Sequence, residues 1–103
     1  MRPPDILGLV QLMKTEDGGR HLVMEAPRFG CVAKISNEYW SCLILLEKGQ
    51  RLAAGASAVV PISFLARLVR GLPRLQEGDV FELWEGKPVG RCLVKTVFPT
   101  FGL

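Results

Sequence analysis

Two apolar runs near the C-terminal end, separated by four turn residues, restrict the fold of this chain more than any other feature. Residues 80–84 and 89–98 are rich in Val, Leu and Phe, and residues 85–88 between them read Glu-Gly-Lys-Pro, which is typical of a turn. Phe81 and Leu83 alternate with their neighbours along the first run, so one face of it points into a core. This pattern predicts an antiparallel β-hairpin.

The rest of the chain contains five further runs with strand character, separated by turn-forming residues. They lie at residues 6–13, 20–25, 29–35, 40–47 and 57–65. Eleven Gly and seven Pro agree with many short strands, and a length of 103 residues predicts one domain over residues 1–103. We therefore expect an all-β protein built around one core.

The glycine pair at residues 18–19 and the proline at position 61 refine the expected strand pairing. Glycine adopts positive φ at little cost, so the run at 20–25 can return antiparallel to the run at 6–13. Pro61 has no amide hydrogen to donate to a neighbouring strand. We therefore expect it at a sheet edge, a bulge or a strand end.

Residues 62–72 fit a helix as well as a strand. Their apolar side chains recur at near-helical spacing, and the Gly-Leu-Pro sequence at 71–73 would end a helix. We expect the strand to end near Leu65 and a short helical turn to follow within residues 66–72. For residues 62–71 both strand and helix stay open.

The charge balance and the cysteines restrict the classes of function. Thirteen Lys and Arg against ten Asp and Glu give a net charge of +3, which permits an acidic partner but falls short of a dedicated nucleic-acid binder. Three cysteines without a CxxC pair indicate free, buried thiols, and hence a cytoplasmic protein. The N-terminal apolar stretch is too interrupted for a signal peptide or a membrane span.

Two motifs resemble those of a known family. Residues 17–21 read Asp-Gly-Gly-Arg-His after the first run, and residues 78–83 read Gly-Asp-Val-Phe-Glu-Leu ahead of Glu-Gly at 85–86 and Val-Gly at 89–90. Their order resembles the C-terminal β-barrel domain (domain 3) of the elongation factor Tu family, as a stand-alone domain. The resemblance implies a closed six-stranded antiparallel barrel, Greek-key-like in its connections, and a surface that binds tRNA.

No catalytic set accompanies these motifs. The sequence lacks the Gly-x-x-x-x-Gly-Lys-Ser/Thr loop of nucleotide-binding proteins, so we expect no bound nucleotide. His21 is the only histidine and lies beside a turn, while Cys31, Cys42 and Cys92 fit core packing better than thiolate chemistry. We expect no enzyme activity, no metal and no cofactor.

Three arginines and two tryptophans are the candidate binding residues. Arg67, Arg70 and Arg74 are spaced by three and four, so on a helix they share one face that can meet phosphates or an acidic protein. Trp40 and Trp84 are candidate anchors of a protein interface, and core packing explains them equally well.

Three functions stay open, in a definite order. The first is a small non-catalytic interaction module that binds a protein partner, such as a bacterial toxin-neutralising protein or a mimic of part of the translation apparatus. The alternative is a β-barrel that binds tRNA or other RNA. An enzyme that uses His21 together with a cysteine or carboxylate ranks third.

Overall fold

The computed structural model describes residues 4–14, 23–65 and 74–99, and the regular structure within them consists of β-strands. No stretch of these residues forms a helix of the length and hydrophobicity that a membrane crossing requires. The strands are β1 (Ile6–Leu12), β2 (Val23–Glu25), β3 (Arg28–Ile35), β4 (Glu38–Leu45), β5 (Arg51–Ala53), β6 (Ser57–Phe64), β7 (Val80–Trp84) and β8 (Pro88–Val97).

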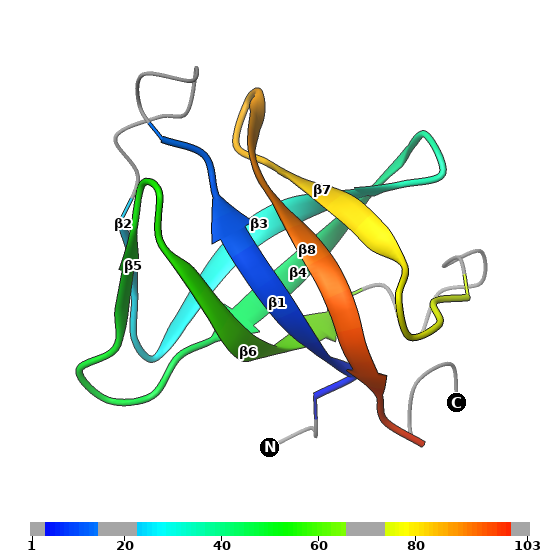
Figure 1. Ribbon diagram of the computed structural model, residues 1–103, viewed down its shortest axis with the longest axis horizontal. Helices are drawn as coiled ribbons and strands as arrows, with labels where there is room; N and C mark the ends of the chain where they lie inside the picture. Colours follow the sequence, from blue (N-terminus) through cyan, green and yellow to red (C-terminus); the bar gives the residue numbers. More distant parts are fainter. Residues whose placement is uncertain (1–3, 15–22, 66–73, 100–103) are drawn as a thin grey trace.

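Six of the strands form a closed antiparallel barrel (Figure 1). The order around the barrel is β1-β6-β4-β3-β7-β8, and β8 pairs back to β1 to close it. Closure gives each barrel strand a neighbour on both sides and removes the open edges at which sheets aggregate. The predicted all-β fold and six-stranded barrel are confirmed.

The inward-facing side chains of the barrel strands fill one core. On β1, Ile6 and Val10 are fully buried, whereas Leu7 and Leu9, which point the other way, keep partial exposure. Phe81 and Leu83 on β7 also point inward, as their alternation predicts. Phe64 and Phe81 pack together within this core, with ring centroids 6.1 Å apart.

The predicted pairing of the run at 20–25 with the run at 6–13 is wrong for the described residues. Strand β2 pairs with β5 in a separate two-stranded sheet, from Val23 opposite Ala53 to Glu25 opposite Arg51. Strand β1 has no free side for β2, because β6 and β8 occupy both of its flanks. The ion pair between Arg51 and Glu25, at 3.3 Å, spans the small sheet.

Strand β6 shows how the barrel accommodates Pro61. This residue lies opposite Leu7 of β1, while pairing with β4 on the other side begins only at Ile62. One side of the strand is therefore unpaired at the position that lacks an amide donor. Strand β6 continues to Phe64, so residues 62–64 are strand, and the helical turn expected within 66–72 lies outside the described residues.

Asp5 ties the end of the barrel together where β1 begins. Its amide donates to the carbonyl of Ile62 at 2.9 Å, and its own carbonyl accepts from the amide of Phe98 at 2.9 Å. Its side chain is fully buried, and Oδ2 accepts a hydrogen bond from the amide of Phe64 at 2.7 Å. Asp5 thus connects the ends of β6 and β8 through its backbone and its side chain.

The β7–β8 hairpin has the turn that its sequence predicts. Gly86 adopts a φ of 79°, and the amide of Glu85 donates to the carbonyl of Lys87 at 2.9 Å. Beyond the turn, the register shifts between Leu83 and Trp84. This irregularity bends β8 beside Gly90, where a barrel wall must curve.

Candidate functional site

The three cysteines lie in the barrel core as free thiols. Cys31 and Cys42 face each other across β3 and β4, with their Sγ atoms 3.5 Å apart. The hydrogen bond with Cys31, together with burial, raises the pKa of the Cys42 thiol well above its usual range, and burial raises the pKa of Cys92 to about 12. A thiolate nucleophile needs a lowered pKa and access to substrate, and Cys42 and Cys92 have neither.

This environment predicts unreactive thiols and a loss of stability at high pH. Folded Cys92 keeps its proton up to about pH 12, whereas an unfolded thiol loses it near 9.0. The stabilisation is complete below pH 9.0 and is lost as the pH rises from 9.0 to about 12. We expect an aromatic disulfide reagent to label no thiol of the folded protein near pH 8, and all three after unfolding.

Denaturant titrations between about pH 8 and pH 11 check the second part of this prediction. The free energy of unfolding of the wild type should fall more steeply with pH than that of Cys92→Ala, because the variant lacks the thiol that titrates. Equal slopes, or rapid labelling of the folded protein, would contradict the prediction.

The other predicted chemical groups do not gather into a reactive site within the described residues. His21, Arg67 and Arg70 lie outside those residues, and Arg74 is exposed ahead of β7. No group of three or more His, Cys, Asp or Glu side chains in the described part can hold a metal ion. Asp79 has a local role, because its Oδ2 accepts a hydrogen bond from the amide of Gln76 at 2.8 Å.

The two tryptophans lie on opposite sides of the barrel wall. Trp40 pairs with Ala33 of β3 and packs against the core, whereas Trp84 pairs with the next residue, Val32. Neighbouring residues of a strand point to opposite faces, so these two indoles do not share a surface. Neither indole Nε1 has a hydrogen-bond partner among the described residues.

Trp84 belongs instead to an outward-facing cluster with Tyr39 and Lys34. The rings of Tyr39 and Trp84 meet edge to face at 5.4 Å across strand β3, and Tyr39 is 56% exposed. The Nζ atom of Lys34 lies 5.4 Å from the Trp84 ring and 3.8 Å from Oε1 of Glu82. The charge of Glu82 is therefore balanced by a lysine that the aromatic rings hold in place.

Register places this cluster at one end of a polar row around the outside of the barrel. Gln11 lies opposite Arg91, Arg91 opposite Glu82, and Glu82 opposite Lys34, which in turn lies opposite Tyr39. Side chains directly opposite each other on one face of a sheet are neighbours. Positive and negative side chains therefore alternate along this row.

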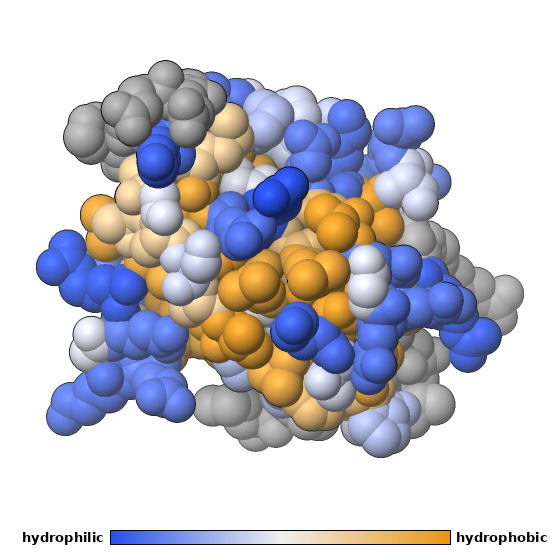
Figure 2. Space-filling view, viewed as in Figure 1, coloured by the Kyte–Doolittle hydropathy of each residue, from blue (hydrophilic) through white to orange (hydrophobic). Residues whose placement is uncertain are grey.

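A row of apolar side chains runs parallel to the polar row. On β1, β8 and β7, each apolar residue of this row lies two positions away from a residue of the polar row. The apolar row joins Val59 on β6 to Leu9 on β1, Leu93 on β8 and Val80 on β7. Val59 is 52% exposed and Val80 is 61% exposed, and they belong to one contiguous row. These four residues are termed the apolar face, and Figure 2 shows hydrophobic surface across the near side of the molecule, where β1 and β8 lie.

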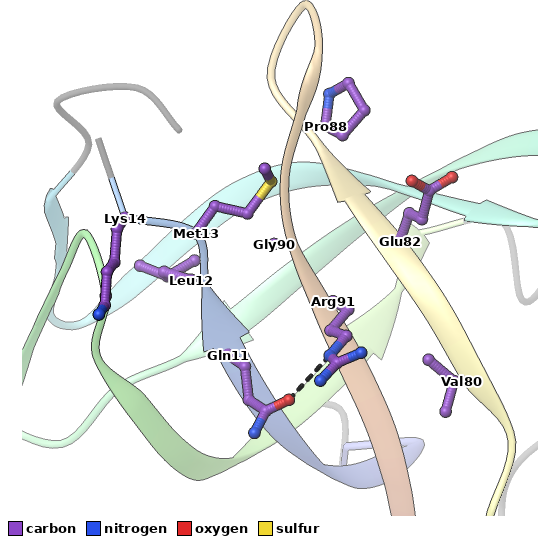
Figure 3. A pocket seen from close by; sticks show the side chains of 10 residues that line it. Gln11, Leu12, Met13, Lys14, Val80, Glu82, Pro88, Gly90 and Arg91 are labelled. Atoms are coloured by element: carbon purple, nitrogen blue, oxygen red, sulfur yellow. Dashed lines mark hydrogen bonds between the residues drawn. The ribbon is translucent and has the colours of Figure 1, made fainter. Parts of the chain in front are cut away.

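A hollow of about 620 Å³ lies at the end of the apolar face (Figure 3). Met13 and Lys14, which follow β1, stand on one side of it, and Glu82 and Pro88 stand on the other. Arg91 and Val80 also line it, and Gly90 lies between the two sides. The hollow is thus continuous with the apolar face through Val80.

Sequence reasoning alone did not identify the apolar face. The run at 6–13 reads as a strand that is buried on both sides, which hides the outward position of Leu9. The available signal was that Leu9, Val59 and Leu93 each lie between two inward-facing residues of a strand, while Val80 directly precedes inward-facing Phe81. Only the register shows that these four positions are neighbours.

No family model matches the sequence, and no curated protein matches it significantly.

Proposed function

We propose that this chain is a small non-catalytic module that binds a protein partner through its apolar face. The observation that carries the proposal is the row of four apolar side chains on four adjacent barrel strands, two of which are more than half exposed. Apolar side chains scattered singly on a surface need no explanation, whereas contiguous ones mark interaction sites. Burying the exposed half of a valine side chain contributes about 1 kcal/mol, so the row supplies a useful share of a binding energy.

The surroundings of the apolar face fit a protein partner better than RNA. A phosphate backbone is bound by clustered positive side chains, whereas Arg91, Glu82 and Lys34 alternate in charge along the neighbouring row. Alternating charges are typical of the polar rim of a protein interface. RNA binding is the alternative function, and the experiment below tests it as well.

Two further features of the proposal concern family and compartment. We place the chain as a stand-alone relative of domain 3 of the elongation factor Tu family, which is supported by the closed six-stranded barrel and by the β7–β8 hairpin at residues 80–97. The free, buried cysteines support a cytoplasmic location, because oxidising compartments favour disulfides.

Substitution of Val80 or Val59 by aspartate tests the proposed function. We expect the purified wild-type protein to capture a specific protein from native cytosol, and Val80→Asp and Val59→Asp to weaken that capture by about tenfold or more, because a charge replaces a buried contact. The matched control is Val23→Asp, since Val23 is a 38% exposed strand valine on β2, outside the apolar face.

Capture should be compared by quantitative mass spectrometry, and thermal unfolding should show that all variants are folded. Equal capture by wild type and Val80→Asp would overturn the proposal. So would capture by the wild type of no protein above the level found with a scrambled control. Capture that is abolished by nuclease treatment, and that weakens steeply as the salt concentration rises, would favour the RNA alternative.

A further inference from the structure

We infer that the hollow at the end of the apolar face is a carboxylate subsite, which binds an acidic group on an extended apolar segment of the protein partner. This inference rests on the proposed function and names the chemistry of the segment that is bound. It depends on three features of the hollow, which are its free donors, its net charge and its apolar walls.

Arg91 supplies the main donors. Its Nε donates to Oε1 of Gln11 at 2.9 Å, and this is its only interaction among the described residues (Figure 3). The hydrogen bond uses the inner nitrogen of the guanidinium and leaves both terminal nitrogens for another acceptor. A guanidinium that is oriented in this way pairs with a carboxylate through two parallel hydrogen bonds.

The balance of charge in the hollow favours a single negative group. Lys14 and Arg91 are the cations that line it, and Glu82 is the acid. Glu82 lies 3.8 Å from the amine of Lys34, so its charge is balanced from outside the hollow. Arg91 and Glu82 lie opposite each other on β8 and β7, yet they form no ion pair within 4 Å. The charge of Arg91 therefore stays available for a ligand.

The walls of the hollow indicate what carries the acid. Met13 and Pro88 are apolar, and Val80 belongs both to the hollow and to the apolar face. A ligand that reaches Arg91 can therefore contact Met13 and Pro88 in the hollow, and can extend from Val80 along the apolar face. A free inorganic anion would leave these walls exposed, whereas an apolar segment with one carboxylate would cover them and satisfy the guanidinium.

Selection from a random peptide library displayed on phage tests the subsite on the whole chain. We expect enriched peptides to carry Asp, Glu or a free C-terminal carboxylate beside apolar residues. A selected peptide is then synthesised in its acidic form and as the Asn or Gln form. The acidic form should bind about tenfold more tightly to the wild type. That preference should disappear in Arg91→Gln and persist in Arg28→Gln, a matched control whose exposed arginine does not line the hollow.

The outcomes separate this inference from the proposed function. Enrichment without acidic residues, or equal binding of the acidic and amide forms, overturns the carboxylate subsite. If such peptides still lose binding on Val80→Asp, the proposed function stands without the subsite. A preference for acid that survives Arg91→Gln also overturns it, because the charge then comes from elsewhere. Failure to enrich any peptide over an unrelated barrel rejects the subsite, and the cytosol capture experiment then decides the proposed function independently.

Discussion

Replacing Asp5 by alanine should destabilise the barrel by about 3 kcal/mol, because a fully buried backbone amide loses its acceptor. Oδ2 of Asp5 accepts the amide of Phe64 at 2.7 Å, at the point where β6 ends. Water cannot replace the carboxylate without entering the core. The free energy of unfolding from denaturant titration measures the loss.

Asp79 provides a matched control for Asp5. Its Oδ2 also accepts a backbone amide, that of Gln76 at 2.8 Å, but in an exposed loop where water can take over the acceptor role. Asp79→Ala should therefore cost about 0.5–1 kcal/mol. Asp5→Asn keeps an acceptor oxygen and should fall between the two alanine variants. If Asp5→Ala and Asp79→Ala lose the same stability, burial is not what makes the Asp5 hydrogen bond important.

Adding a methyl group at Gly90 should destabilise the protein by about 3 kcal/mol, at the upper end of the usual cost of overpacking. A Cβ atom at this position would lie 2.6 Å from the backbone oxygen of Gln11 and 3.2 Å from Cα of Leu12. Both atoms belong to the backbone of β1, which is fixed by its pairing with β6 and β8. The clash can be relieved only by moving a paired strand.

Gly8 offers a comparison in which the obstacle is a side chain. A Cβ atom there would clash with Sγ of Cys92. Gly8→Ala alone should cost about 2 kcal/mol, and adding Cys92→Ala should recover part of that loss because the sulfur is removed. The same second substitution should not rescue Gly90→Ala. A double-mutant cycle from denaturant titrations measures both couplings, and rescue of Gly90→Ala by Cys92→Ala would contradict the steric argument.

The β7–β8 hairpin was predictable because its determinants are local. Phe81 and Leu83 alternate with outward residues, and a glycine at position 86 supplies the positive φ of the turn. Pro61 was expected at a sheet edge, a bulge or a strand end, and it lies instead within β6, paired with β1 at a position that has no partner on β4. The β2–β5 pair was not predictable, since three-residue strands depend on distant partners rather than on their own pattern.

The candidate site was harder to predict from the sequence than the fold. Trp40 and Trp84 were grouped because both are tryptophans, yet one packs on the core and the other lies outside the wall. Arg91 was not among the binding residues predicted from the sequence. Its pairing with Gln11, 80 residues away in sequence, depends on closure of the barrel.

The order of apolar and turn residues along the chain was enough to determine an all-β fold, because strand alternation and turn chemistry act over a few residues, whereas the closed six-stranded barrel was expected from the resemblance. The apolar face and the hollow beside it were decided by the tertiary structure alone. They exist because closure sets the register of β6, β1, β8 and β7, and register brings Val59, Leu9, Leu93 and Val80 into one row from four separate parts of the sequence.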